Sequence, residues 1–395
     1  MTPSLAALSA LLEAGRREGI APALSAAVIA GGTLVHASWH GALPLPGQGE
    51  RALSRDDLFD VASLTKVMAT TTLAAQLCGA GALDLDAPVA ARLPGFEAGG
   101  KGQVTARHLL AHASGLPAWR PYWELAARDP VAGAAFRPPG ERSPLPSLRD
   151  AFARGGAVVR AAVMDEPLER PPGTSAVYSD AGFIALGLLV EAVARAPLSR
   201  LAAERVFGPM GLASTSHLDA LEPGDGPARL AGRAFVPTGW SEARRAVSLG
   251  VVNDDNAWAV GGGAPQAGVF STATDVAAFG QAWLVALAGG PSVVAPEVAR
   301  RFVARDRTPS SGRALGWDTP TGQSSIGDRL GRGPRGAVGH LGYTGTSLWI
   351  DLDAEIAVAL LTNHVHPTGR ADRPRLNAFR RGFHDAVAEA LGIRG

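Results

Sequence analysis

Several residue types that support common functions are scarce in this chain. Cysteine occurs once in 395 residues, at position 78, so no internal disulfide can form. Because Cys78 belongs to no cluster of cysteines and histidines, the sequence argues against a structural zinc site, and we expect neither a metal nor another cofactor. Excess charge of one sign is also missing: 18% of the residues are charged and the formal net charge is +1. That balance gives no indication of nucleic acid or of an anionic membrane as a partner.

Long apolar runs are missing too. One of the longest, residues 181–190, ends at Glu191, well short of the roughly 20 residues that a membrane-spanning helix needs. The first residues after Met1 predict an amphipathic helix rather than the basic front and apolar core of a secretory signal. We therefore expect a cytoplasmic protein, or a periplasmic or secreted one if the true start lies upstream of Met1.

The most informative stretch that is present is Ser63-Leu-Thr-Lys66, followed by the apolar run 67–78. Small and apolar residues fill this run, which predicts a buried helix that ends at Gly79 and Gly81. Residues three apart share a helix face, so Lys66 is expected one turn beyond Ser63. At a helix start, free N–H groups and the dipole favour the negative charge of an oxyanion. A serine hydroxyl with a nearby base is the pattern of an activated nucleophile.

Lysine is rare enough to be a clue. Of 37 lysines and arginines only two are lysine, Lys66 and Lys101, and the other 35 are arginine. Arginine cannot be deprotonated in a protein, whereas a lysine among apolar side chains loses some of its preference for charge and can act as a base. Taken alone, Ser63 and Lys66 could also be a helix cap and a snorkelling surface residue. Lys101 lies in a glycine-rich loop, and we expect it to affect neither activity nor stability.

Both ends of the chain predict β-structure. The runs 23–30 and 33–39 around a Gly-Gly pair indicate a hairpin, and 346–351 and 355–362 mirror it near the C-terminus, before a helix over about 374–391. The middle is mainly helical, with an exposed excursion at 137–149. We expect a sheet domain from 1–66 and 241–395, a mainly helical domain from 67–240, and an active site between them.

Taken one at a time, the other polar residues are explained by packing or by local hydrogen bonding. His108 and His112 are four apart and could bind a metal, but no further ligand follows at a suitable spacing, so packing or turn hydrogen bonding is favoured. Asp254 and Asp255 could serve acid–base chemistry or a cation, and a solvated turn with a helix N-cap is preferred. Tyr178 on its own would be a packed anchor of its loop. His340 on its own would be a histidine at a strand end whose ring nitrogens simply have hydrogen-bond partners.

Together these motifs resemble the serine β-lactamase and penicillin-binding protein superfamily, especially its class C-like branch of β-lactamases, esterases and D-aminopeptidases. The resemblance covers about Leu24 to Leu361 and includes similar phrases at 109–117 and 268–272. Its first motif is Ser63-Leu-Thr-Lys66. The second, Tyr-x-Asn in much of the family, resembles Tyr178-Ser-Asp180, and the third, Lys-Thr-Gly or His-x-Gly, resembles His340-Leu-Gly342.

The resemblance implies a fold and a set of roles. The fold is α/β of the α+β kind, a five-stranded antiparallel sheet flanked by helices plus a mainly helical lobe. Ser63 would be acylated, Lys66 would be its proton partner, and Tyr178 would be the general base and later the acid. His340 would face the Tyr178–Lys66 pair. Gly342 and Tyr343 would lie on the opposite wall, where the Tyr343 N–H joins that of Ser63 in an oxyanion hole.

Two departures from the family pattern narrow the activity. Asp180 replaces an amide that could donate to a substrate carbonyl, and an ionised carboxylate only accepts. His340 stands where β-lactamases have a permanently charged lysine. We therefore predict a metal-free serine hydrolase that forms an acyl-enzyme on a small-molecule ester. Within enzymes the alternatives are a β-lactamase or a D-amino-acid peptidase acting on a β-lactam or amide, and a dormant binding or scaffold protein is the alternative from another class.

Overall fold

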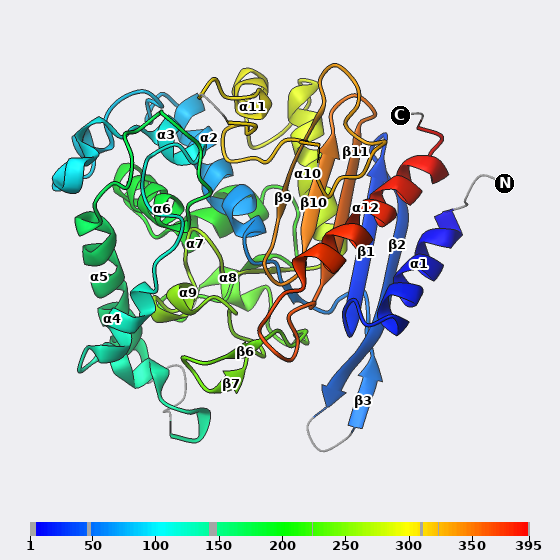
Figure 1. The fold of residues 1–395 in the computed structure, drawn as a ribbon, viewed down its shortest axis with the longest axis horizontal. Coiled ribbons are helices and arrows are strands. Elements are labelled where there is room, and N and C mark those ends of the chain that lie inside the picture. The colour runs from blue at the N-terminus through cyan, green and yellow to red at the C-terminus, as the bar shows by residue number, and fades with distance from the viewer. Residues whose placement is uncertain are drawn as a thin grey trace.

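The computed structural model describes residues 5–45, 49–141, 148–222, 224–308, 311–322 and 324–393. Its largest element is an antiparallel sheet of six strands in the order β3-β2-β1-β11-β10-β9, which brings the two ends of the chain together (Figure 1). The strands are β1 (Ala23–Ala30), β2 (Thr33–Leu45), β3 (Gly49–Ala52), β9 (Ala337–Leu341), β10 (Ser347–Asp351) and β11 (Ile356–Thr362). The prediction that strands from both chain ends belong to one sheet is confirmed, since β1 pairs with β11. The short β3, which pairs only with the far part of β2, adds a sixth strand to the five expected.

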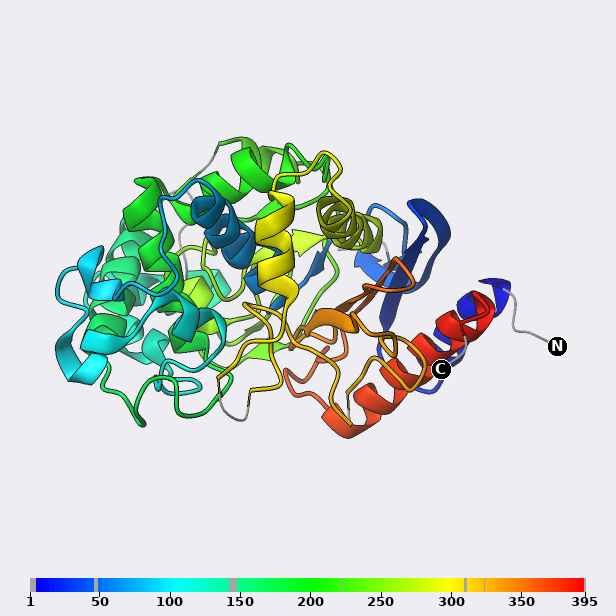
Figure 2. The ribbon, with the colours of Figure 1, turned by 90° about the horizontal axis from the view of Figure 1, so that it is seen from above.

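Helices cover both faces of this sheet. On the outer face lie α1 (Leu5–Arg17) and α12 (Arg373–Ala390), side by side, and on the inner face lies α10 (Ala273–Leu287) (Figures 1 and 2). Successive side chains of a strand point to opposite faces. Because both faces are covered, all seven residues of β11 are buried, which explains why these strands are apolar throughout rather than alternating.

The remaining helices pack beside the inner face. They are α2 (Thr72–Gly79), α3 (Ala106–Leu110), α4 (Tyr122–Arg128), α5 (Arg149–Asp165), α6 (Asp180–Ala194), α7 (Leu198–Ala202), α8 (Asp225–Ala228), α9 (Asp255–Ala259) and α11 (Pro296–Val303). Two small sheets accompany them, one of β4 (Phe59–Asp60), β8 (Val269–Ser271) and β5 (Ser216–His217), the other of β6 (Trp240–Ser241) and β7 (Ala246–Val247). The division into domains at 66 and 240 stays a prediction, and residues 142–147 of the predicted excursion lie outside the described residues.

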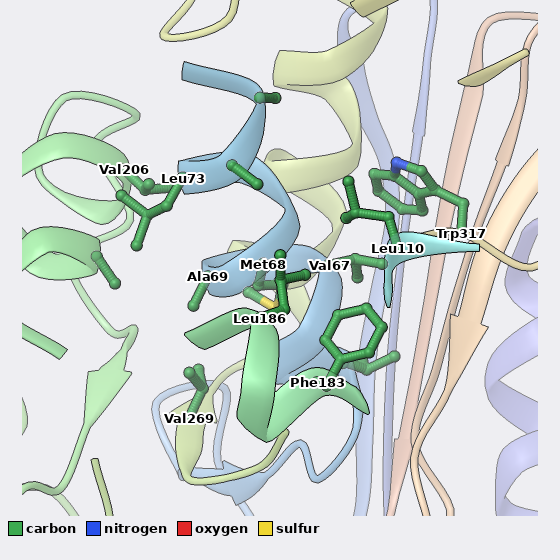
Figure 3. Close-up of a cluster of buried hydrophobic side chains, with 14 of the residues drawn as sticks. Val67, Met68, Ala69, Leu73, Leu110, Phe183, Leu186, Val206, Val269 and Trp317 are labelled. Carbon is green, nitrogen blue, oxygen red and sulfur yellow. The ribbon is translucent and has the colours of Figure 1, made fainter. Parts of the chain in front are cut away.

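The predicted buried helix after Ser63 is confirmed. It begins as a π-helix, Lys66–Thr71, and continues as α2 to Gly79, the first of the two glycines expected to end it. Its apolar side chains, Met68 among them, share one buried cluster with Phe183 and Leu186 of α6 and with Trp317, which lies between α11 and β9 (Figure 3). Packing on all sides fixes the position of this helix, and with it the direction in which the Ser63 and Lys66 side chains point.

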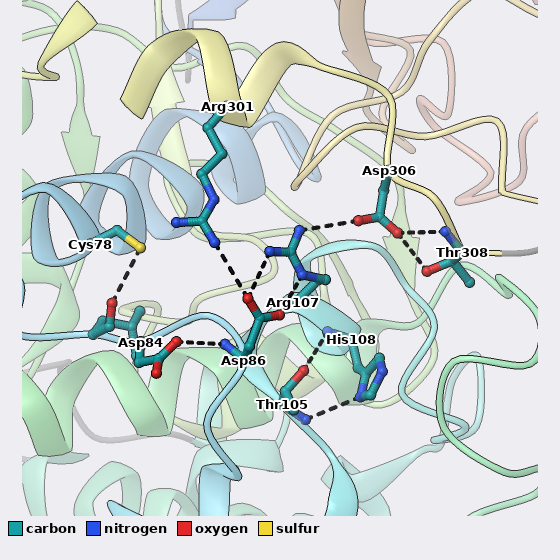
Figure 4. A network of polar contacts seen from close by, with 10 residues as sticks. Cys78, Asp84, Asp86, Thr105, Arg107, His108, Arg301, Asp306 and Thr308 are labelled. Carbon is teal, nitrogen blue, oxygen red and sulfur yellow. Dashed lines mark hydrogen bonds and ion pairs between the residues drawn. The ribbon is translucent and has the colours of Figure 1, made fainter. Parts of the chain in front are cut away.

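Polar contacts tie the surroundings of α3 together (Figure 4). Asp86 accepts from Arg107 of α3 at 2.6 Å and from Arg301 of α11 at 3.5 Å. The Thr105 N–H donates to His108 Nδ1 at 3.2 Å, while Thr105 Oγ1 accepts from the His108 N–H at 3.2 Å. This reciprocal cap confirms the turn hydrogen bonding that was predicted for His108.

Over the described ranges, no single helix is long and apolar enough to cross a membrane. One bent pair, 180–194 with 198–207, meets the requirement by length and composition alone.

Candidate active site

Ser63 lies on a tight loop between β4 and the π-helix. The preceding residue, Ala62, has φ of 49°, a left-handed conformation that costs free energy for a residue with a Cβ and is held only by its surroundings. The Ala62 N–H donates to Asp60 Oδ1 at 2.8 Å, and Asp60 Oδ2 accepts from the Asn253 N–H at 2.6 Å. Burial raises the pKa of this Asp60 carboxyl to about 6. The buried carboxylate therefore acts as a clamp that fixes the loop carrying Ser63.

The structure brings the Ser63, Lys66 and Tyr178 side chains together. Lys66 Nζ donates to Ser63 Oγ at 2.9 Å, and Tyr178 OH donates to the same Oγ at 2.9 Å. Ser63 and Lys66 come from one helix start, whereas Tyr178 arrives from a loop 115 residues later. A serine oxygen flanked by two groups that can exchange protons with it has the geometry required of an activated nucleophile.

Lys66 is fully buried and lies in an ion pair. Its Nζ is 2.7 Å from Asp180 Oδ1 and also donates to the Gln266 carbonyl at 2.9 Å. Burial acts to lower the pKa of Lys66, but the Asp180 charge, with a smaller contribution from Tyr178, outweighs it and the pKa is raised. The expectation that apolar surroundings would favour a neutral Lys66 is therefore wrong for the resting protein, because a carboxylate shares its pocket.

Tyr178 is held by the start of α6. Ser179 is the N-cap of this helix: its Oγ accepts from the Gly182 N–H at 2.9 Å and donates to the Pro117 carbonyl at 2.6 Å. Burial raises the pKa of Tyr178 despite the opposing effect of Lys66, so the resting phenol is neutral and is a donor to Ser63. Asp180, the first residue of α6, thereby points at Lys66 and not freely into solvent.

His112 forms a wall of the site, which the sequence did not indicate. Its ring packs against that of Tyr178 with centroids 4.6 Å apart and an interplanar angle of 33°, and its Nδ1 accepts from the Ser179 N–H at 3.0 Å. Burial, followed by the charges of Arg313 and Lys66, lowers the pKa of His112 well below its usual value. Of the two predicted roles, packing and turn hydrogen bonding, the structure confirms packing, because His112 is buried and its bond reaches Ser179, 67 residues away. That bond fixes the backbone next to Tyr178.

His340 of β9 faces Tyr178, with ring centroids 5.9 Å apart. Its Nδ1 contacts the Leu341 carbonyl at 3.0 Å; because a carbonyl only accepts, Nδ1 carries the proton and Nε2 is a bare acceptor. Among the described residues this buried Nε2 has no hydrogen-bond partner. Burial, followed by the positive charges of Lys66 and Arg313, lowers the pKa of His340 well below its usual value, so it is neutral.

Arg313 supplies a positive charge that no motif indicated. Its guanidinium lies over the Tyr178 ring, 5.4 Å from the centroid, and pairs with Asp318. The side chain is 25% exposed, so it can be reached from solvent. In the sequence it is one arginine among 35, in a segment without regular structure, and nothing local distinguishes it.

Two backbone N–H groups, one of Ser63 and one of Tyr343 in the turn after β9, are available as donors. Within the part of the chain that is described, neither the Ser63 N–H nor the Tyr343 N–H donates a hydrogen bond. Thr344 Oγ1 donates to the Asp60 carbonyl at 2.8 Å and Thr346 Oγ1 to the Val61 carbonyl at 2.9 Å. These bonds join the turn that carries Tyr343 to the loop that carries Ser63.

Gly342 allows this close approach. A Cβ there would lie 2.0 Å from Thr346 Oγ1 and 2.6 Å from the Val61 carbonyl, so no other residue fits without moving the turn. The Tyr343 side chain points away, and its OH donates to the Gly369 carbonyl at 2.9 Å. Of the predicted substrate-binding residues, Gly342 and Tyr343 can therefore contribute through their backbone, while the Asp180 side chain is committed to Lys66.

Several known proteins resemble this chain in sequence and in fold. The family model described as Beta-lactamase matches residues 8–381. An Escherichia coli (strain K12) protein named "Putative D-alanyl-D-alanine carboxypeptidase" is 27% identical over 341 residues, 82% of this chain and 73% of that protein. Among solved structures, EstCE1, described as a hydrolase with promiscuous acyltransferase activity, has a TM-score of 0.67 at 21% identity and covers 97% of this chain and 98% of its own. A penicillin-binding protein homologue from Caulobacter crescentus has a TM-score of 0.66 at 19% identity and covers 97% of each chain.

Proposed function

The chain belongs to the beta-lactamase family of serine hydrolases, and within it we propose an esterase that works through an acyl-enzyme on Ser63. The observation that carries this proposal is the placement of Ser63 Oγ 2.9 Å from Lys66 Nζ and 2.9 Å from Tyr178 OH. A dormant binding protein on the same fold would have no use for two proton-exchanging groups directed at one serine. The description of EstCE1 as a hydrolase with acyltransferase activity agrees with acyl transfer on this fold.

The first half of the reaction forms the acyl-enzyme. The Lys66–Tyr178 pair is fully protonated at rest and must lose one proton before it can act as a base. Ser63 Oγ then attacks the ester carbonyl, and its proton passes to this pair. The carbonyl oxygen becomes an oxyanion that accepts from the N–H groups of Ser63 and Tyr343. Tyr178 returns the proton to the leaving alcohol as the C–O bond breaks.

The second half releases the acid. A water molecule takes the place of the alcohol, gives a proton to the Lys66–Tyr178 pair and attacks the acyl carbonyl. The same two N–H groups stabilise the second oxyanion, and Ser63 Oγ leaves with the returned proton. His340 is neutral and borders Tyr178, and it takes no proton from the Lys66–Tyr178 pair. Its free Nε2 can accept a hydrogen bond from a donor group of the substrate.

Esters are favoured over β-lactams because of the polar groups available. The amide donor of the family pattern is missing at Asp180, whose carboxylate faces Lys66, and a neutral His340 replaces a permanent charge. Losing one charge-assisted contact costs about 1.5–3 kcal/mol, or roughly 10- to 150-fold in binding. An ester of a short acid requires neither contact.

A D-amino-acid carboxypeptidase is the second candidate, and Arg313 is the observation that favours it. Its partly exposed guanidinium beside Tyr178 could exchange Asp318 for the free carboxylate of a peptide substrate, because guanidinium and carboxylate groups pair in a fork. The name of the Escherichia coli relative points to the same chemistry.

One set of assays on purified wild type and Ser63→Ala tests these proposals. We expect a fluorophosphonate to add once to wild type and not to the variant, measured by intact mass. We also expect kcat/KM for p-nitrophenyl butyrate to exceed the values for a D-alanyl-D-alanine peptide and a chromogenic cephalosporin. Labelling of Ser63→Ala at the wild-type level would refute the nucleophile. A higher kcat/KM on the peptide would select the carboxypeptidase, and a higher value on the cephalosporin a β-lactamase.

A further inference from the structure

Arg380 is a buried cation that the proposed reaction does not use. It lies on α12, on the outer side of the sheet, and only 3% of it is exposed. Over the described residues no carboxylate forms an ion pair with its guanidinium. Burial lowers the pKa of Arg380 to about 9. Because burying an unpaired charge is unfavourable, the contacts that it makes need an explanation.

The guanidinium donates to the turn that follows β9. Its Nη2 lies 2.7 Å from the Thr346 carbonyl and 3.3 Å from the Gly342 carbonyl, and Nη1 lies 3.1 Å from Asn377 Oδ1. Neither backbone carbonyl depends on it for satisfaction. The Thr346 carbonyl already accepts from the Gly342 N–H at 2.8 Å, and the Gly342 carbonyl accepts from the Gly345 N–H at 3.1 Å. A role in filling empty hydrogen-bonding positions therefore does not account for Arg380.

The Gly342 carbonyl belongs to the same peptide group as the Tyr343 N–H. This peptide bond is trans, and a trans peptide is planar with its C=O and N–H pointing in opposite directions. A guanidinium that holds the carbonyl thus fixes the plane of this peptide group, and with it the direction of the Tyr343 N–H. A positive charge at the carbonyl oxygen also polarises the group and makes its N–H a stronger donor, because hydrogen bonds in a chain reinforce one another.

We propose that Arg380 is a positioning residue for the oxyanion hole, acting from behind the sheet through the Gly342–Tyr343 peptide. The turn is then held from two directions: Thr344 and Thr346 join it to the nucleophile loop, and Arg380 joins it to α12. This inference rests on the proposed acyl-enzyme chemistry at Ser63, because only an oxyanion requires the Tyr343 N–H.

The test compares Arg380→Met with Val387→Ala, a core change two turns further along α12 that removes apolar packing and leaves the turn untouched. Each variant is assayed at the same interval below its own Tm. For Arg380→Met we expect kcat for p-nitrophenyl butyrate to fall by about 10- to 100-fold with KM nearly unchanged, less than the roughly 10²–10³-fold effect of removing an oxyanion donor. Val387→Ala should keep the wild-type kcat.

A second readout separates positioning from general damage. Phenylboronic acid adds to Ser63 Oγ through a new B–O bond while the Ser63 hydroxyl proton passes to the Lys66–Tyr178 pair, and the resulting anionic boronate places an oxygen in the oxyanion hole. Its inhibition constant should rise for Arg380→Met by the same factor as kcat falls, while the pH of half-maximal activity stays in place. Values of kcat and inhibition constant within about threefold of Val387→Ala would overturn the proposal, since an oxyanion contact is worth much more.

If Arg380→Met fails to fold, Arg380→Lys carries the test. An ammonium keeps the charge but lacks the planar fork that reaches two carbonyls, so we expect kcat and boronate affinity to fall together by about 3- to 10-fold, part of the loss expected for a misplaced donor. Wild-type values for Arg380→Lys in that case would refute the role of the fork. The underlying proposal fails separately: if Ser63→Ala remains active, there is no Ser63 oxyanion for any Arg380 variant to affect.

Discussion

Replacing Asp180 by asparagine should move the acid limb of the pH–rate profile to lower pH. In the resting site the Asp180 carboxylate is 2.7 Å from Lys66 Nζ and holds this buried ammonium in its charged form. Ser63 can be activated only after the Lys66–Tyr178 pair has lost a proton. Without the carboxylate the effect of burial, which lowers the pKa of Lys66, is no longer outweighed, and the proton leaves at a lower pH.

The size of the shift follows from the distance. An opposite charge within about 4–6 Å raises the pKa of a cationic group by roughly 1–3 units, equivalent to about 1.4–4 kcal/mol between the two protonation states. The Asp180 side chain is 20% exposed, so solvent screens only part of the interaction. We therefore expect the pH of half-maximal kcat/KM to fall by about 1–3 units in Asp180→Asn, with kcat on the plateau within about tenfold of wild type.

The assay is kcat/KM for p-nitrophenyl butyrate over the pH range in which the protein stays folded, since this parameter reports the ionisation of the free enzyme. Asp254→Asn is the matched control. This variant also removes a carboxylate near Lys66, but Asp254 makes no ion pair with Lys66 and instead accepts from the Ala257 N–H at 2.7 Å. The acid limb of Asp254→Asn should therefore move by less than half as much as that of Asp180→Asn. An unchanged or higher midpoint in Asp180→Asn would refute the reasoning that Lys66 must lose its proton.

Three further predictions concern single residues. Lys66→Met should lower kcat by about 10²–10⁴-fold, whereas Lys101→Met should lower only Tm; equal losses of kcat in both would deny Lys66 a special role. Burial raises the pKa of Asp254 to about 6 from about 3.9 unfolded, so its ionisation destabilises the fold above pH 6 and the penalty vanishes below pH 4. Urea unfolding should therefore show Asp254→Asn gaining up to about 3 kcal/mol relative to wild type between pH 4 and pH 8, and a constant difference would contradict the assignment. Gly342→Ala should lower kcat by about 10²-fold through the clash with Thr346, with circular dichroism as the check on folding; wild-type kcat would show that the turn tolerates a Cβ.

Local pattern was enough to predict most of the framework. Apolar runs bounded by turn residues or glycines predicted the strands at both chain ends and the helix after Ser63, because such runs have few alternatives once both sides must be buried. The family resemblance carried by three short motifs placed Ser63, Lys66 and Tyr178 in one site, and Lys66 Nζ and Tyr178 OH each lie 2.9 Å from Ser63 Oγ.

Residues that act through long-range packing could not be predicted. Arg313 and Arg380 approach the site from a loop and from the outer face of the sheet, and in a chain with 35 arginines neither has a local signature. His112 was visible, but its contact with Tyr178 depends on how α3 and α6 meet. The charge of Lys66 depends on Asp180, and a sequence shows which residues are present without showing which of them share a pocket.

The two lysines show what a compositional clue can and cannot establish. Lys101 lies in the glycine-rich loop and was expected to affect neither activity nor stability, but it is fully buried: its Nζ donates to the Glu166 carbonyl at 2.6 Å and lies 5.3 Å from the centre of the Phe96 ring. Both lysines thus occupy closed pockets with few acceptors, where a guanidinium with five donors would leave several unsatisfied. Scarcity of lysine therefore marks buried ammonium groups, whether or not they are catalytic. What separates Lys66 from Lys101 is its neighbours, a serine oxygen and a phenol that can exchange protons with it, in place of a carbonyl that cannot.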